Sequence, residues 1–139
     1  MHKNNEFYSN MKTVFSIHNL LFKGSFVPNV LPELFGYDYM PLTNGSVELN
    51  GSVSFLKGGI NYSDQITTVS NTYAEEIKTQ QYGEGLDGLL RCKSDFLKGI
   101  VNGIDYEEFD PEKDNLIFKN FTWDSISDKV ENKLSLQKE

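Results

Sequence analysis

Cysteine and histidine, which build many metal and redox sites, are scarce in this 139-residue sequence. Its one cysteine, Cys92, has no second cysteine with which to form an intrachain disulfide. The two histidines are too few for a Cys/His zinc site. We therefore expect a protein without a metal site or a cofactor, in a reducing, cytoplasmic environment.

Basic charge and long apolar runs are also missing. Lys and Arg number 13 against 20 Asp and Glu, giving a net charge of −7, and the basic residues form no cluster. This balance argues against a nucleic-acid partner, because nucleic acids are bound largely through their phosphate charges. No window reaches the roughly 18 apolar residues of a membrane span, and residues 1–13 lack the apolar stretch of a signal peptide. We therefore expect no membrane partner and no export.

The apolar content is sufficient for one globular domain, or for one domain and a piece. Hydrophobic residues make up 38% and aromatic residues 13%, which excludes the disordered and fibrous classes. Three β-rich runs, at residues 12–17, 65–70 and 97–101, do not alternate polar and apolar side chains. Because helical stretches lie between them, the sequence predicts an α/β fold with a parallel sheet.

The connection between the first two predicted strands is long and rich in proline. Residues 24–51 hold three of the four prolines and predict an ordered loop with a short helix near residues 32–35. This loop is either a lid over a site or a segment that only packs against the rest of the domain. In the following residues, 53–62, the hydrophobic pattern has no clear period, so the sequence does not distinguish a helix from a strand there.

Two short helices are predicted between the second and third strands. The first runs from about residue 70 to residue 78. Its cap is either Thr72, through a capping box with Glu75, or Ser70. The second helix is predicted over residues 88–96.

Polar side chains follow the first and third predicted strands. His18 and Asn19 come directly after residues 12–17, and Asn102 follows residues 97–101. The carboxyl ends of parallel strands meet at one edge of a sheet, where α/β proteins bind ligands. Each residue also has a plainer interpretation, since a lone histidine is often structural and Asn before Gly is a turn signal. Spacing alone therefore predicts a soluble α/β domain with an open ligand edge.

Three motifs resemble known sites but are better explained in other ways. GEGLDG at residues 83–88 has the GxGxxG pattern, yet it follows a predicted helix and carries two acids that would repel a diphosphate. KGG at residues 57–59 lacks the other residues of a phosphate loop, which favours close helix packing. The acidic residues between 110 and 114 mimic a calcium loop, but Asn115 and Phe121 stand where that loop needs Gly and Glu.

The last part of the sequence has a different character. Residues 105–115 are acidic, contain the fourth proline and have few core-forming side chains, which predicts a linker. An amphipathic helix is predicted over residues 123–139. Its apolar stripe consists of Ile126, Val130 and Leu134, which repeat every four residues.

Five ordered blocks closely resemble bacterial glycogen synthase and plant starch synthase. They are TVFSIHNLLFKG at 13–24, FLKGGINYSDQITTVSNTYAEEIKT at 55–79, YGEGLDGLLR at 82–91, GIVNGIDYEEFDPEKD at 99–114 and NKLSLQKE at 132–139. They cover over half of the chain, and no other family known to us has HNL, LKGGI, GEGLDG and NGID in this order.

The resemblance implies the two-domain GT-B architecture, with two Rossmann-like halves facing a cleft. It also implies transfer of glucose from ADP-glucose to the non-reducing end of an α-1,4-glucan with retention of configuration. The chain would be an internal fragment. Residues 1–104 would be part of the N-terminal Rossmann-like domain, residues 105–115 the interdomain linker and residues 116–139 the first helical segment of the C-terminal domain. The family's diphosphate-binding KxGGL loop and Arg/Lys pair lie outside this chain, so we expect the isolated chain to be inactive.

By the same resemblance, His18 corresponds to the family's active-site histidine, which lies against the transferred glucosyl group. We therefore expect it to be both catalytic and substrate-binding. Asn19 beside it and Asn102 of NGID are expected to bind substrate in the same cleft. Enzymes of this type are usually described without a protein nucleophile, so catalysis consists mainly of positioning and charge stabilisation. LLFKG at 20–24, where the family often has LAYQG, bears on acceptor contacts more than on the fold.

Two other hypotheses remain from the sequence. The chain is alternatively a non-catalytic, truncated gene product with weak glucan or partner binding. A third hypothesis is a related GT-B transferase that uses another nucleotide sugar, because most donor-reading residues lie outside the chain. A truncated sheet would also leave an edge and an apolar face uncovered, which predicts self-association through either of them.

Overall fold

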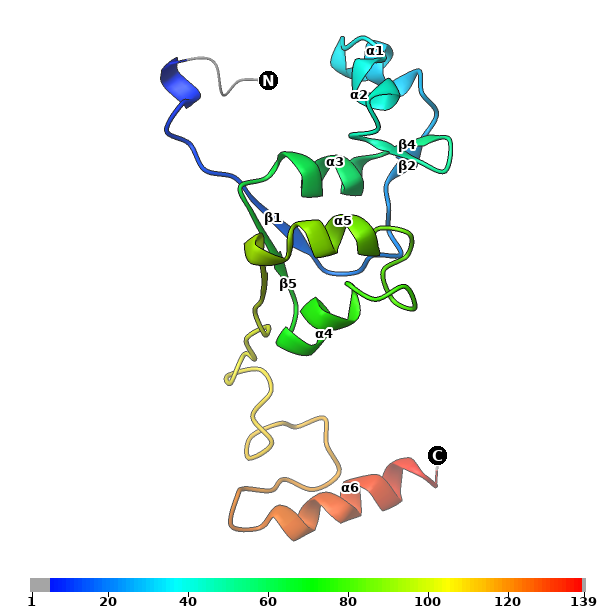
Figure 1. Ribbon diagram of the computed structural model, residues 1–139. Helices are drawn as coiled ribbons and strands as arrows, with labels where there is room; N and C mark the ends of the chain where they lie inside the picture. The colour runs from blue at the N-terminus through cyan, green and yellow to red at the C-terminus, as the bar shows by residue number, and fades with distance from the viewer. Residues whose placement is uncertain (1–5, 139) are drawn as a thin grey trace. The chain divides into compact units, whose positions relative to one another are not determined.

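The computed structural model describes residues 6–138. This part of the chain divides into two compact units, with the boundary between Asn102 and Gly103 (Figure 1). Within residues 6–138, no helix has both the length and the apolar character needed to cross a membrane.

A parallel sheet of order β1-β5-β6 organises the first unit. Its strands are β1 (Val14–Ile17), β5 (Gln65–Thr68) and β6 (Leu97–Gly99). Ile17 pairs with Thr68 and Thr68 pairs with Gly99, so the three strands end at the same level. The α/β fold class with a parallel sheet is therefore confirmed, although the third strand ends before residues 100–101.

Helices connect these strands across one face of the sheet. In Figure 1 the helix α5 crosses in front of β1 and β5, with α3 above it and α4 below it. The core between helices and sheet includes Ile66 of β5, Ile60 of α3 and Leu90 of α5, each with 0% exposure. The connecting helices are α3 (Phe55–Tyr62), α4 (Asn71–Glu76), α5 (Asp87–Cys92) and the 3₁₀ helix η3 (Ser94–Phe96).

Two local predictions about these helices have different outcomes. A Cβ atom at Gly59 of α3 would overlap the ring of Phe15, so the close helix packing predicted for KGG is confirmed. The capping box at Thr72 is wrong, because α4 already begins at Asn71. Ser70 is the cap instead, and its hydroxyl accepts the N–H of Tyr73 at 2.9 Å.

The other face of the sheet carries mainly polar side chains. Lys98 and Gln65 are exposed there, and the hydroxyls of Ser16 and Thr67 are hydrogen-bonded at 2.8 Å. Val14 is the large apolar exception, with 62% exposure. The uncovered face of these three strands is therefore mainly polar, and the apolar uncovered face predicted from the sequence is not present. The unpaired edge strand predicted from the sequence is present. Within the described chain, β1 pairs with β5 on one side and with no strand on the other.

Residues 24–54 form a small lobe between β1 and α3. The short helix predicted there is confirmed, but a second helix and a second sheet, of antiparallel order β2-β4-β3, are also present. Asn50 and Gly51 join two of these strands with φ values of 52° and 80°, as a two-residue hairpin turn requires. The lobe's elements are β2 (Ser25–Phe26), α1 (Val30–Phe35), α2 (Met40–Thr43), β3 (Glu48–Leu49) and β4 (Ser52–Ser54).

The second unit consists of turns followed by a short helical segment. The helix predicted over 123–139 begins later than expected, as the 3₁₀ helix η4 (Ile126–Asp128) and the helix α6 (Lys129–Leu136). The side-chain amide of Asn132 holds the backbone of Lys119, accepting its N–H and donating to its carbonyl, both at 2.8 Å. None of the side chains described from residue 103 to residue 138 is buried.

Candidate active site at the carboxyl edge of the parallel sheet

The three site residues predicted from the sequence follow strands that end at one edge of the sheet. His18 and Asn19 come directly after β1, and Asn102 comes shortly after β6; all three are exposed. Since β5 lies between β1 and β6, the ends of these two strands lie roughly 10 Å apart. The structure thus brings the predicted positions to one edge but not onto neighbouring strands. Their roles in binding and catalysis stay predictions.

The backbone around His18 is held by the adjacent β5–α4 segment. The hydroxyl of Thr68, a buried residue at the end of β5, donates to the carbonyl oxygen of Ile17 at 2.8 Å. Tyr73 of α4 accepts the N–H of Leu20 on its hydroxyl oxygen at 3.3 Å. The chain is therefore anchored on both sides of the two exposed residues, His18 and Asn19.

The rest of the loop after β1 is tied to two further elements. The carbonyl oxygen of Lys23 accepts the hydroxyl of Ser54 at 2.9 Å and the N–H of Leu56 at 3.2 Å, at the start of α3. The Lys23 ammonium forms an ion pair with Glu84 at 2.9 Å. Glu84 belongs to GEGLDG, which follows α4 rather than a strand, as predicted. This motif serves here as a contact for the loop after β1.

The exposed groups at this edge are suited to binding hydroxyl-rich ligands. The imidazole of His18 and the amides of Asn19 and Asn102 donate and accept hydrogen bonds. The amide oxygen of Asn19 accepts the N–H of Leu21 at 2.9 Å, which leaves its NH₂ group to meet a ligand. Groups of this kind can position and polarise a bound molecule through hydrogen bonds; none of them is a hydroxyl or thiol nucleophile.

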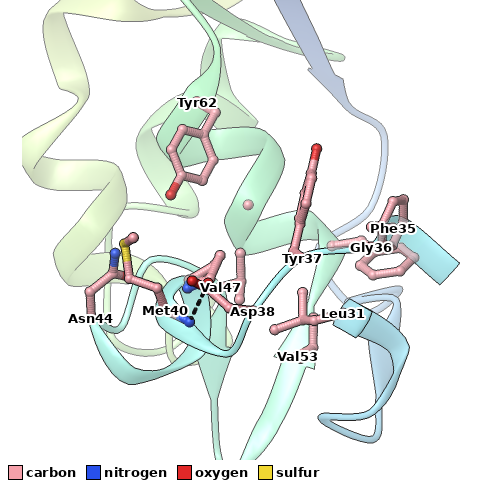
Figure 2. A pocket seen from close by; sticks show the side chains of 13 residues that line it. Leu31, Phe35, Gly36, Tyr37, Asp38, Met40, Asn44, Val47, Val53 and Tyr62 are labelled. Atoms are coloured by element: carbon pink, nitrogen blue, oxygen red, sulfur yellow. Dashed lines mark hydrogen bonds between the residues drawn. The ribbon is translucent and has the colours of Figure 1, made fainter. Parts of the chain in front are cut away.

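A separate pocket of about 780 Å³ lies in the lobe, between α1, α2 and the outer side of α3 (Figure 2). Its wall is mainly apolar and aromatic. Its polar groups include Asp38, whose carboxylate accepts the N–H of Met40 at 2.9 Å, and Tyr62, whose hydroxyl donates to Ser46 at 2.8 Å. It does not include the three predicted site residues. The pocket is lined by Leu31, Phe35, Gly36, Tyr37, Asp38, Met40, Pro41, Asn44, Val47, Val53, Phe55, Gly58 and Tyr62.

The described residues, 6–138, contain no group of three or more His, Cys, Asp or Glu side chains that is arranged to hold a metal ion. In the acidic stretch, the carboxylate of Asp110 contacts the chain itself. Asp110 accepts the N–H of Glu112 at 3.0 Å and forms an ion pair with Lys113 at 3.2 Å. These contacts lower the pKa of Asp110, the backbone hydrogen bond most strongly.

Sequence reasoning missed the groups that support the edge. Thr68 ends the central strand of the sheet, but the sequence predicted that strand over residues 65–70 and gave no strand order, so its position at the same edge as His18 was not predicted. The contact of Tyr73 with Leu20, and that of Lys23 with Glu84, join segments over 50 residues apart. No local pattern predicts them.

Comparisons with known proteins agree on one family. A model of the starch synthase catalytic domain matches residues 1–92, about two thirds of the chain. Glycogen synthase of Clostridium perfringens (strain 13 / Type A) is 68% identical over 96% of this chain and 28% of its own length. Glycogen synthase of Thermosipho melanesiensis is 48% identical over 100% of this chain and 29% of its own length.

A solved structure is also similar. It is the catalytic domain of Starch Synthase IV from Arabidopsis thaliana bound to ADP and acarbose, 29% identical, with a TM-score of 0.75. The match covers 99% of this chain and 29% of that one. This chain thus spans less than a third of the length of these relatives. The fold, the five sequence blocks and these matches together place it in one family: the chain belongs to the starch synthase catalytic domain family.

Proposed function

We propose that this chain is a fragment of an ADP-glucose-dependent glycogen synthase with the GT-B architecture. The intact enzyme transfers glucose from ADP-glucose to the non-reducing end of an α-1,4-glucan. The observation that carries the proposal is the place of His18, exposed directly after β1 at the ligand-binding edge, in a chain 68% identical to a glycogen synthase. The ADP and acarbose bound to the related starch synthase support a nucleotide and a saccharide as partners.

The proposed reaction needs positioned hydrogen bonds rather than a protein nucleophile. The bond between the anomeric carbon and the diphosphate breaks, and a bond from that carbon to the acceptor hydroxyl oxygen forms on the same face. The acceptor proton passes to the departing diphosphate. His18 hydrogen-bonds the glucosyl group being transferred, while Asn19 and Asn102 hold hydroxyls in the same cleft. Such positioning and charge stabilisation account for large parts of enzymatic rate enhancements.

The proposal also assigns the parts of the chain. Residues 1–104 belong to the N-terminal domain, residues 105–115 cross to the second domain and residues 116–139 begin it. The division of the structure between Asn102 and Gly103 supports a boundary in this region. The cytoplasmic location and the self-association inferred from the sequence stay predictions.

The test is a transfer assay on the polypeptide that carries this sequence in its cell, whose size an immunoblot against the chain determines. Labelled ADP-glucose and glycogen are the substrates, with UDP-glucose as the alternative donor. We expect transfer from ADP-glucose by the intact polypeptide and none by residues 1–139 alone. His18→Ala should lower kcat by about 100-fold or more, as loss of a transition-state hydrogen bond does.

The matched control is Gln65→Ala, an exposed side chain at the opposite end of the sheet. It should leave kcat and KM unchanged. Absence of glucan labelling by the intact wild-type polypeptide would refute the proposed activity. Equal activity of the His18→Ala variant would refute the role of His18 alone.

A further inference from the structure

His18 and Asn19 lie in the loop after β1. On each side of this pair, the backbone of the chain is hydrogen-bonded to a side-chain hydroxyl. Before His18, the carbonyl of Ile17 accepts the Thr68 hydroxyl at 2.8 Å. After Asn19, the N–H of Leu20 donates to the Tyr73 hydroxyl at 3.3 Å. Both hydroxyls come from the β5–α4 segment, so one neighbouring element sets the path of the loop on both sides.

The contact from Thr68 is the more consequential of the two. The carbonyl of Ile17 belongs to the peptide group that links Ile17 to His18, so fixing its plane fixes the direction of the first backbone bond of His18. Thr68 is 4% exposed and Ile17 is 1% exposed, so water does not readily replace this hydrogen bond. A β-branched side chain such as threonine also has few χ1 rotamers, which keeps its hydroxyl in place.

We propose that Thr68 is a positioning residue for His18: its hydroxyl orients the Ile17–His18 peptide and thereby the imidazole at the carboxyl edge. Thr68 does not reach the substrate and acts through His18. Tyr73 supports the same loop from its far side, through the longer contact to Leu20. This inference rests on the proposed function for its catalytic consequence, but the orientation of His18 is measurable without activity.

The first experiment measures the side-chain conformation of His18 by NMR in the 139-residue chain. Selective labelling of histidine simplifies the spectrum, because the sequence has two histidines. Three-bond couplings report whether χ1 of His18 occupies one staggered rotamer or averages over several. We expect one dominant rotamer in the wild type and in Thr68→Ser, and rotamer averaging in Thr68→Val, which has a similar shape but lacks the hydroxyl.

Thr67→Val is the matched control for the loss of a hydroxyl. Thr67 is the preceding residue of β5, and its hydroxyl contacts Ser16 of β1 at 2.8 Å on the open face of the sheet. This variant should leave the His18 couplings unchanged. Unchanged couplings in folded Thr68→Val would overturn the inference.

If Thr68→Val does not fold, Tyr73→Phe provides the second variant. It removes the acceptor of the Leu20 N–H and should broaden the rotamer distribution of His18, by less than Thr68→Val would. Couplings in Tyr73→Phe identical to those of the wild type would then count against the inference.

The second experiment is a double-mutant cycle in the intact, active polypeptide. Thr68→Val should lower kcat by about 10- to 100-fold with KM for the nucleotide sugar nearly unchanged, because misplacing a catalytic group affects kcat most. In a His18→Ala background the same change should alter kcat by less than about twofold. Equal losses in both backgrounds would mean a general structural role and would overturn the inference. If the wild-type polypeptide is inactive, the proposed function fails, and the couplings alone decide the role of Thr68.

Discussion

The two units of this chain hold their folds by different means. The first unit has a continuous apolar core in which Ile60, Ile66 and Leu90 are completely buried. In the second unit, the described residues 103–138 bury none of their side chains. Its large apolar residues are exposed instead, with Leu116 at 95% and Trp123 at 88%.

The second unit keeps its shape through polar contacts on the surface. Asn132 pairs with the backbone of Lys119, whose ammonium also lies 2.9 Å from Glu131 and 3.7 Å from Asp128. Exposed ion pairs such as these contribute far less to stability than a buried core does. A segment with this composition gains most of its stability by packing on another surface. The difference supports our assignment of residues 116–139 to the start of a further domain.

The largest expected contrast is between truncations of an apolar side chain in each of the two units. Ile66→Ala removes a side chain with 0% exposure and should lower the free energy of unfolding by about 2–5 kcal/mol. Leu134→Ala removes a side chain of α6 with 51% exposure and should cost less than about 0.5 kcal/mol. Urea unfolding followed by circular dichroism measures both. Equal losses would mean that the second unit has a core of its own and would end the comparison.

Two glycines on either side of the unit boundary sharpen the contrast. A Cβ atom at Gly99 would overlap the backbone of Ser70 and Asn71, whereas a Cβ atom at Gly103 would meet nothing within 4 Å. Gly99→Ala should therefore destabilise the chain by about 1–3 kcal/mol through overpacking. Gly103→Ala should leave the midpoint of thermal unfolding unchanged. Thermal unfolding followed by circular dichroism measures both variants. A lowered midpoint for Gly103→Ala would show packing across the boundary.

The smallest expected effect is a pH dependence confined to the second unit. The hydrogen bond with Glu131 and the charge of Asp128 raise the pKa of Lys119 above its ordinary value of 10.5. Because the folded-state pKa is the higher one, this contribution is complete below about pH 10.5 and is lost as pH rises through the folded-state pKa. NMR signals of α6 and of Lys119 should therefore change at alkaline pH.

The control for this titration is Lys119→Gln, which keeps a polar side chain without the charge. It should remove the part of the alkaline change in α6 that follows from breaking the Lys119 ion pairs, while leaving the signals of Ile66 in place. At acidic pH the sign is opposite for Asp110, whose pKa is lowered, so its contribution is lost as pH falls through the folded-state pKa. Signals of α6 that stay constant from pH 9 to pH 12 would contradict the role of the ion pairs.

Much of the sheet was predictable from sequence because its signals are local. The β-branched run at β5 and the polar residue after β1 identified strands and their shared edge. The lobe was predictable only in part. Asn50-Gly51 is a strong hairpin signal, but the strands beside it, β3 and β4, are too short to show a period. Ser70 rather than Thr72 caps α4, because the helix already begins at Asn71.

The candidate site shows the same limit more clearly. His18, Asn19 and Asn102 carry their own signals, a polar side chain at a strand end. The two hydroxyls that hold the loop have no such signal in the sequence. Thr68 has the pattern of an ordinary strand residue, and Tyr73 has that of an ordinary helix residue. Their contacts form only when segments over 50 residues apart meet in the folded sheet.

The strand order β1-β5-β6 also has a consequence for the chain as it emerges from the ribosome. His18 leaves the ribosome well before Asn102, and at roughly 5–20 residues per second the interval lasts several seconds. Because β5 spans residues 65–68 and β6 spans residues 97–99, β1 can pair with β5 before β6 has been synthesised. The carboxyl edge of the sheet is therefore completed strand by strand in the order β1, β5, β6, and the first residue of the site to be synthesised waits for the last.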